Sequence, residues 1–183
     1  DASNNGGTYA GGISLWSGYG ADVVSVTSTR KDSGPLVGGL GVRTVTSLNT
    51  GLGNDNVTVT LSSATDEFFA VNTQGPYDHD YTGVARTDDD TVNASASSLP
   101  LVIFGGQGKD DIVGGNNNDI IFGDRGRVEY TDSSGNSVQV LGWGGLSDKT
   151  DGLAHLIGAI RTVDLEIGSN DYIDAAEGRN IVF

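Results

Sequence analysis

The sequence predicts an all-β protein built from short stacked strands, and three observations support this. The chain of 183 residues contains 29 Gly but only 3 Pro, which indicates many turns with positive φ and not a proline-rich disordered chain. Of its 24 acidic residues, 20 are Asp, a residue that favours turns and cation-binding loops because its carboxylate lies close to the backbone. A nine-residue unit repeats in register from Gly105 onward. We therefore expect tight Asp-containing turns that alternate with short strands.

The repeat is the clearest signal in the sequence. Residues 105–113 read Gly-Gly-Gln-Gly-Lys-Asp-Asp-Ile-Val, and residues 114–122 read Gly-Gly-Asn-Asn-Asn-Asp-Ile-Ile-Phe. A third unit begins at Gly123 and then leaves the pattern. A period of nine fits about six residues of turn followed by about three residues of strand.

Stacking of these units predicts two ladders. We expect Asp110 to lie above Asp119 and Ile112 above Ile121, with the apolar ladder inside and the acidic ladder along the turns. Carboxylate and carbonyl oxygens in such a groove suit a hard cation such as calcium. The alternative is a glycine-rich hairpin without metal.

The pattern Gly-Gly-x-Gly-x-Asp-x-apolar-x resembles the hemolysin-type calcium-binding repeat (RTX) family. The resemblance implies a right-handed parallel β-roll with calcium bound between successive turns. It also implies side-chain ligands from the turn aspartates and carbonyl ligands from other turn residues, namely Asp110, Asp119, Gly105, Gln107, Gly114 and Asn116. The stretch of about residues 101–183 is similar to a long unit found repeatedly in very large RTX-rich proteins.

Weaker copies of the turn occur elsewhere in the chain. They place an Asp directly before a strand at Asp22, Asp55 and Asp171. For each of these the sequence leaves two interpretations open, a calcium ligand or an ordinary turn residue. Asn180 takes the place of the Asp nine residues after Asp171, which predicts a turn without metal.

The expected fold is a right-handed parallel β-roll or β-helix, a solenoid with a hairpin and short-helix insertion. Residues 1–98 are expected to form wider β-helix coils, with a small antiparallel sandwich as the alternative. The nonapeptide roll covers 99–126, the insertion 127–166 and the return to the roll 167–183. Because the last residues fall in the register of a nonapeptide strand, we expect the roll to continue beyond them or to dock onto another surface. Strands are predicted at 13–15, 23–26, 42–45, 57–61 and 68–71, a hairpin at 127–141 and a helix at 152–160.

Two acidic segments lie outside the repeats. The run Asp88-Asp89-Asp90 is expected to be a solvated loop, although Asp90 also precedes a strand-like Thr-Val pair. A His flanked by two Asp at residues 78–80 gives a weak indication of transition-metal binding. Two Asn-x-Ser/Thr sequons, at Asn56 and Asn93, would matter only in a eukaryotic secreted protein.

Composition narrows the function. A net charge of −14 disfavours nucleic acid and anionic lipid as partners, and the absence of Cys excludes disulfides and thiolate metal sites. No apolar stretch approaches the length of a membrane span. No zinc-protease, nucleophile-elbow or phosphate-loop motif is present, so we do not expect an enzyme, although a polysaccharide-active β-helix enzyme remains a rival.

The expected function is therefore a calcium-binding structural or adhesive module. It would be secreted or exposed at the cell surface and would bind calcium ions as its cofactor. Its expected partners are copies of itself or neighbouring repeats arranged end to end in a filament or a giant surface protein, or cell-surface or matrix ligands. The alternative is a calcium-dependent folding and export module of a secreted toxin or hydrolase.

Overall fold

The computed structural model describes residues 12–31, 44–75, 88–144 and 153–183, which form strands in three sheets and no helix. Sheet A is parallel and has the order β1-β3-β5-β7-β9-β14. Sheet B is also parallel and has the order β13-β8-β6-β4-β2. The third sheet, here the insertion sheet, is antiparallel with the order β11-β10-β12.

The strands are short in both parallel sheets. Those of sheet A are β1 (Ile13–Trp16), β3 (Thr46–Asn49), β5 (Phe69–Asn72), β7 (Leu101–Phe104), β9 (Ile120–Phe122) and β14 (Ile181–Val182). Those of sheet B are β2 (Val23–Val26), β4 (Asn56–Val59), β6 (Thr91–Asn93), β8 (Asp111–Val113) and β13 (Tyr172–Asp174). The insertion sheet contains β10 (Gly126–Thr131), β11 (Ser137–Leu141) and β12 (Leu156–Thr162).

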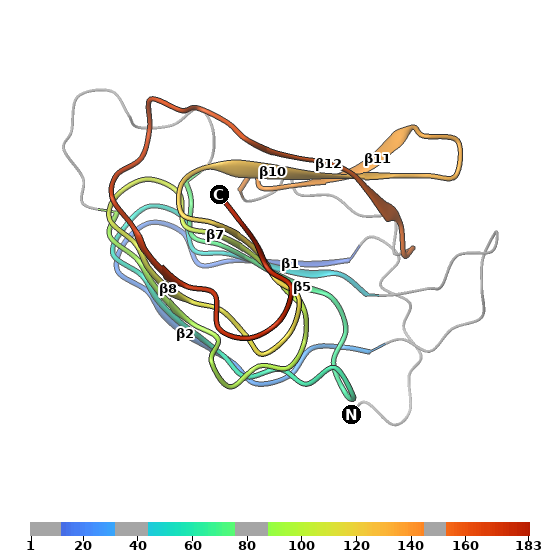
Figure 1. The fold of residues 1–183 in the computed structure, drawn as a ribbon. Helices are drawn as coiled ribbons and strands as arrows, with labels where there is room; N and C mark the ends of the chain where they lie inside the picture. The colour runs from blue at the N-terminus through green and yellow to red at the C-terminus, as the bar shows by residue number, and fades with distance from the viewer. Residues whose placement is uncertain (1–11, 32–43, 76–87, 145–152) are drawn as a thin grey trace.

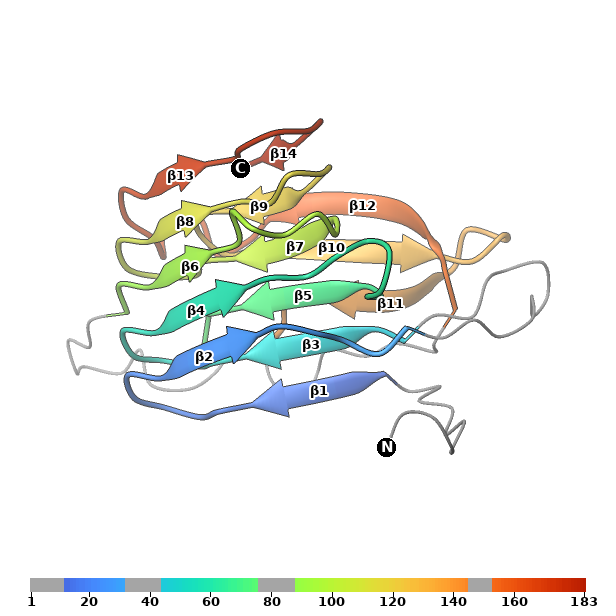
Figure 2. The ribbon, with the colours of Figure 1, turned by 90° about the horizontal axis from the view of Figure 1, so that it is seen from below.

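The chain alternates between sheets A and B as it runs from β1 to β9, and one strand of each sheet makes one coil. Figure 1 shows the coils lying over one another, and Figure 2 shows the stack from the side, with β1 and β2 near one end and β13 and β14 at the other. The all-β class with parallel sheets is confirmed. The antiparallel sandwich considered for residues 1–98 is wrong, because β1 pairs with β3 and β2 pairs with β4 in parallel.

The core lies between sheets A and B. In β4, Val57 and Val59 are buried while Asn56 and Thr58 are exposed, the period-two alternation of a strand with one face inside. Parallel register places the inward side chains above one another, so Val57 pairs with Val92 of the next coil. Burying a Val or Ile side chain stabilises the fold by about 1.5–3 kcal/mol, and this gain recurs in each inner coil.

Successive nonapeptides lie on opposite sheets, which corrects the expected stacking. Ile112 of β8 pairs with Val92 and Ile173 in sheet B, whereas Ile121 of β9 pairs with Ile103 in sheet A. The reason is geometric. A six-residue turn reverses the direction of the chain, so nine residues complete only half a coil.

The insertion sheet contains the predicted hairpin but not the predicted helix. Val128 of β10 faces Leu141 of β11 across the turn at 132–136. Residues 156–162 form β12 and pair with β10, with Ile160 opposite Val128. The apolar spacing in this segment fits a helix, but its β-branched residues and Gly158 favour a strand, and the edge of β10 offers backbone partners.

A second core joins the insertion sheet to the outer face of sheet A. It contains Phe104 and Phe122 from sheet A and Val128, Tyr130 and Leu141 from the insertion sheet. Figure 1 shows β10, β11 and β12 along one side of the stack. Sheet A is therefore buried on both faces over β5, β7 and β9. In the part of the chain that the structure describes, no helix is long and apolar enough to cross a membrane.

Candidate metal centre

Every strand of sheet B is preceded by an aspartate. Each of these residues ends the first corner, the segment that leads from a sheet A strand to the next sheet B strand. Because the sheet B strands are paired in register, the aspartates form one column along the stack. We call this column the aspartate ladder; its members are Asp22, Asp55, Asp90, Asp110 and Asp171.

One hydrogen bond repeats along the aspartate ladder. The backbone N–H of Asp22 donates to Oδ1 of Asp55 at 2.8 Å, and that of Asp55 donates to Oδ1 of Asp90 at 2.8 Å. The N–H of Asp90 donates to Oδ1 of Asp110 at 2.9 Å, and that of Asp110 donates to Oδ1 of Asp171 at 3.0 Å. Each carboxylate from Asp55 onward therefore uses one oxygen to hold the preceding coil.

The second oxygen has no such partner. Oδ2 is buried and meets no hydrogen-bond donor of suitable geometry in Asp22, Asp55, Asp90 and Asp110. The hydroxyls of Thr50 and Thr73 lie near Asp55 and Asp90 and lower the pKa values of these carboxyl groups, but the Thr73 hydroxyl already donates to backbone carbonyls. Asp88, two residues before Asp90, shows the same arrangement, since its Oδ1 accepts from the N–H of Gly53 at 2.6 Å while its Oδ2 is buried and unpartnered. A buried acceptor without a partner costs about 1–3 kcal/mol, and more when it is charged. A cation is one kind of partner that such buried carboxylate oxygens can bind.

The pKa values of these carboxyl groups also indicate that the corner lacks positive charge. The pKa of Asp90 is raised to about 9, that of Asp110 to about 8 and that of Asp88 to about 7, with burial as the largest cause and repulsion from neighbouring carboxylates as a smaller one. Burial also raises the pKa values of Asp55 and Asp171. Without a counter-charge Asp90 and Asp110 hold protons near neutral pH. A divalent cation would replace the protons and remove the repulsion.

The backbone at the first corner is packed so closely that glycine is required. Gly53 has φ of +136° and Gly108 has φ of +97°. A Cβ on Gly53 would overlap the carbonyl oxygen of Gly20, and a Cβ on Gly108 would overlap that of Asp88. Carbonyl oxygens therefore face the neighbouring coil along this corner. They lie in the same corner segments as the aspartates of the aspartate ladder.

Carboxylates alone would not complete a metal site here. In residues 12–31, 44–75, 88–144 and 153–183, no group of three or more Asp, Glu, His or Cys residues is placed to hold one ion. A cation in the aspartate ladder would need backbone carbonyls or water beside the carboxylates. Calcium, which takes 6–8 oxygen ligands of mixed kinds, tolerates such a shell.

The predicted ligands fall into two groups. Asp22, Asp55, Asp110 and Asp171 belong to the aspartate ladder, and Gly105 and Gln107 lie in the first corner that Asp110 ends. A Cβ on Gly105 would meet Oδ2 of Asp110, so the first glycine of this turn lies against its aspartate. These predicted residues therefore share one side of the stack.

Asp119, Gly114 and Asn116 lie elsewhere, in the second corner, the segment that leads from sheet B back to sheet A. The expected stacking of Asp110 over Asp119 is therefore wrong. Oδ1 of Asp119 accepts from the N–H of Leu101 at 2.8 Å, and Oδ2 accepts from the N–H of Gly115 at 2.7 Å. Both of its oxygens already have backbone donors, so this carboxylate does not share the feature that marks the aspartate ladder.

The insertion interrupts the first corner of the last coil, between β9 and β13. Gly123 opens it after β9 and Asp171 closes it before β13, although the residues between them include the whole insertion sheet. A Cβ on Gly123 would overlap Oδ2 of Asp171, the same relationship as that between Gly105 and Asp110. The insertion thus leaves the turn geometry intact.

Asp88 and Asp90 were missed as site residues. Both are only 1% exposed, so the expectation of a solvated loop for residues 88–90 holds for Asp89 alone. The available signal was the position of Asp90 directly before a strand, which it shares with Asp55 and Asp110. The acidic residues at 78–80 and their His lie outside the described residues.

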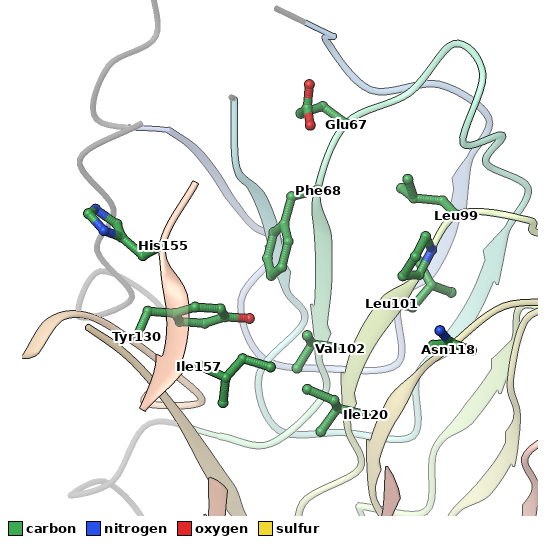
Figure 3. A pocket seen from close by; sticks show the side chains of 11 residues that line it. Glu67, Phe68, Leu99, Leu101, Val102, Asn118, Ile120, Tyr130, His155 and Ile157 are labelled. Carbon is green, nitrogen blue, oxygen red and sulfur yellow. The ribbon is translucent and has the colours of Figure 1, made fainter. Parts of the chain in front are cut away.

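A pocket of about 360 Å³ lies on another part of the molecule, where the insertion sheet meets sheet A beside the second corner. Figure 3 shows Phe68, which directly precedes β5, and Tyr130 of β10 facing it, with His155 and Ile157 on the side of the insertion. The Phe68 and Tyr130 rings meet edge to face, 6.0 Å apart. The lining is mainly apolar, and the pocket shares no residue with the aspartate ladder.

Comparison with known proteins finds no relative to set beside this geometry: no protein-family model, no curated protein and no solved structure matches the chain.

Proposed function

We propose that the aspartate ladder binds calcium ions between successive coils, and that the chain is a calcium-stabilised, right-handed β-roll. The observation that supports this most strongly is the column of buried, unpartnered Oδ2 atoms in Asp22, Asp55, Asp90 and Asp110. Parallel strands lie about 4.8 Å apart, which is about twice the calcium–oxygen distance of about 2.4 Å. Carboxylates stacked at the coil spacing therefore suit an ion shared by two coils.

The donor set favours calcium over other metals. The aspartate ladder offers only oxygen, and the chain has no Cys, so zinc and copper have none of the soft ligands that they prefer. Magnesium requires near-ideal octahedral geometry and releases its water reluctantly. A column of fixed carboxylates and backbone carbonyls suits the larger and more adaptable calcium ion.

Bound calcium would stabilise the folded coils and would not take part in a reaction. It would neutralise carboxylates whose raised pKa values oppose ionisation, and so fasten each coil to the next. Extracellular calcium modules bind with Kd of about 10⁻⁴–10⁻³ M, so such sites would be empty in the cytosol and filled outside the cell. We propose on this basis a secreted or surface-exposed structural or adhesive module that becomes rigid after export.

The test is a thermal melt of the chain in EDTA and in calcium, followed by circular dichroism. A ligand at about a hundredfold excess over Kd stabilises the folded state by about 2.7 kcal/mol. For a chain of this length, that corresponds to a rise in Tm of about 5–10 °C. Magnesium at the same concentration should give a smaller rise. An unchanged Tm in calcium, with no heat of calcium binding by calorimetry, would refute the proposal.

A further inference from the structure

One residue of the first corner departs from the repeat by adding a carboxylate. Asp88 stands two residues before its ladder aspartate, a position that Gly53 and Gly108 occupy in the neighbouring coils. The N–H of Gly53 donates to Oδ1 of Asp88, and a Cβ on Gly108 would overlap the Asp88 carbonyl, so Asp88 lies between these two glycines in the stack. Its Oδ2 is buried and meets no hydrogen-bond donor. This coil therefore buries a second carboxylate in addition to that of Asp90.

Another residue of the first corner departs from the repeat by adding a buried cation. Arg125 is the third residue of the corner that Gly123 opens, the position that Gln107 takes in the corner opened by Gly105. Gln107 is half-buried, whereas Arg125 is only 1% exposed. Burying a guanidinium is costly unless negative groups or other acceptors lie close to it. The corner therefore has to supply Arg125 with such partners.

The segment that follows the insertion sheet holds Arg125 in place. Nε of Arg125 lies 3.1 Å from Oδ2 of Asp164, a side chain that is 17% exposed, and the Arg125 carbonyl accepts from the N–H of Val163 at 3.0 Å. Asp164 adopts φ of +51°, a conformation that is uncommon outside Gly and persists only where the surrounding structure fixes it. The ion pair therefore joins the two parts of the corner that the insertion separates.

The charge of Arg125 also reaches Asp88, although their coils are not adjacent. The strand β8 lies between β6, which follows Asp88, and β13, which follows the corner of Arg125 (Figure 2). Burial is the largest influence on Asp88 and raises its pKa to about 7, and the Arg125 charge acts against that rise. Because Oδ2 of Asp88 meets no donor, this is an interaction between charges at a distance, and such interactions are strong where water is excluded.

We propose that Arg125 is a built-in cation of the first corner: it forms an ion pair with Asp164, offsets the buried charge of Asp88 and keeps a metal ion from binding beside Asp88. A second cation at that place would be repelled by the buried guanidinium. The exclusion of metal rests on the proposed function, whereas the pairing of charges does not. The aspartate ladder keeps its ions, and Arg125 limits how many ions the corner holds.

Calorimetry of calcium binding to the 183-residue chain tests the exclusion of metal. Arg125→Met removes the charge but keeps a long side chain, so this variant should bind one more ion per chain than the unmodified protein. Arg125→Lys keeps the charge and should bind the unmodified number of ions. Arg161→Met is the matched control, because the Arg161 side chain is 49% exposed and pairs with Glu129 in the insertion sheet. It removes the same charge and should leave the number of ions unchanged.

A double-mutant cycle in EDTA tests the pairing of charges without calcium. Arg125→Met should lower the urea denaturation midpoint, and addition of Asp88→Asn should recover part of that loss, because the carboxylate that lost its counter-charge is then removed. The amide oxygen of Asn can still accept from the N–H of Gly53. If Arg125→Met does not fold in EDTA, calcium or Asp88→Asn should restore the fold, and failure of both would overturn the proposal.

The remaining outcomes separate the two parts of the proposal from the proposed function. Additive losses in the cycle would overturn the pairing of Arg125 with Asp88. An unchanged number of ions in Arg125→Met, or the same gain in Arg161→Met, would overturn the exclusion of metal. Absence of calcium binding in every chain, the unmodified one included, would refute the proposed function, while the cycle in EDTA would still decide the pairing of charges.

Discussion

The backbone N–H of Asp90 donates to Oδ1 of Asp110 at 2.9 Å, and both side chains are buried. The two residues are 20 positions apart and belong to successive coils. The bond uses one oxygen of Asp110 and leaves the other buried without a partner. This pairing brings together two carboxyl groups whose pKa values are both raised by burial.

The first prediction concerns the charge of Asp110. In Asp110→Asn the amide oxygen can still accept from Asp90, but a buried charge and a proposed ligand are lost. We expect calcium affinity to fall at least about tenfold, which is about 1.4 kcal/mol, and the protein in EDTA to become more stable because the cost of burying or protonating this carboxylate is removed. Melts in EDTA and in calcium, together with calorimetry, measure both effects.

Asp111→Asn is the matched control, because Asp111 is the next residue and is exposed on β8. It removes the same charge at the adjacent position without touching the aspartate ladder, so both quantities should stay close to those of the unmodified chain. Equal loss of calcium affinity in the two variants would mean that general acidity holds the ions, and not the aspartate ladder.

The second prediction concerns pH. The pKa of Asp90 rises from 3.8 to about 9 and that of Asp110 to about 8 on folding. Between the unfolded-state pKa of 3.8 and the folded-state values of about 8 and 9, the folded protein binds more protons than the unfolded chain. Its stability therefore falls as pH rises, by about 1.4 kcal/mol per pH unit for each proton of difference. The stabilising contribution is complete below about pH 4 and lost as pH passes through about 8–9.

Urea denaturation in EDTA at pH 5, 7 and 9 measures this dependence. The denaturation midpoint of the calcium-free protein should decrease across the series. In saturating calcium the trend should weaken or reverse, because the ion binds the deprotonated form and releases protons. A midpoint in EDTA that rises from pH 5 to pH 9 would contradict the burial of these carboxylates.

The local part of this site could be predicted from the sequence, but its assembly could not. An Asp directly before a strand is a local pattern that marks Asp22, Asp55, Asp110 and Asp171, although for all of these but Asp110 the sequence leaves a calcium ligand and an ordinary turn residue as equal interpretations. Which coil lies on which depends on turns and insertions of unequal length. That is why Asp110 was expected over Asp119, when its neighbours in the aspartate ladder are Asp90 and Asp171.

Two further misses have the same origin. The run at 88–90 has the composition of a solvated loop, and only the stacking of β6 between β4 and β8 buries Asp88 and Asp90. The segment that became β12 has apolar residues at helical spacing, and its pairing with the edge of β10 decides the outcome. The local sequence pattern indicates where many of the strands form, whereas pairing between distant segments decides which strands become neighbours.

The third prediction concerns the close approach of coils at Gly53. Ala at this position would have to adopt φ near +136° and its Cβ would overlap the backbone of Gly20. Gly135→Ala is the control, because φ there is also positive, +82°, but nothing lies within 4 Å of the new Cβ. We expect about 1–2 kcal/mol of destabilisation for Gly135→Ala from backbone strain alone, and clearly more for Gly53→Ala. Chemical denaturation measures the two, and equal losses would argue against close coil stacking at this corner.

The last prediction concerns the turn that the insertion divides. Gly123→Ala places a Cβ against Oδ2 of Asp171, and Gly158→Ala places one against the side chain of Thr131 in the insertion sheet. Neither glycine has positive φ, so the two variants test steric overlap at two sites without added backbone strain. Both should lose stability, because a crowded methyl forces neighbours to shift at a cost of about 1–3 kcal/mol. Only Gly123→Ala should also weaken calcium binding, since it displaces a carboxylate of the aspartate ladder. Calorimetry at a temperature where both variants are folded measures that difference. Unchanged calcium binding in Gly123→Ala would show that the divided turn is not part of the calcium site.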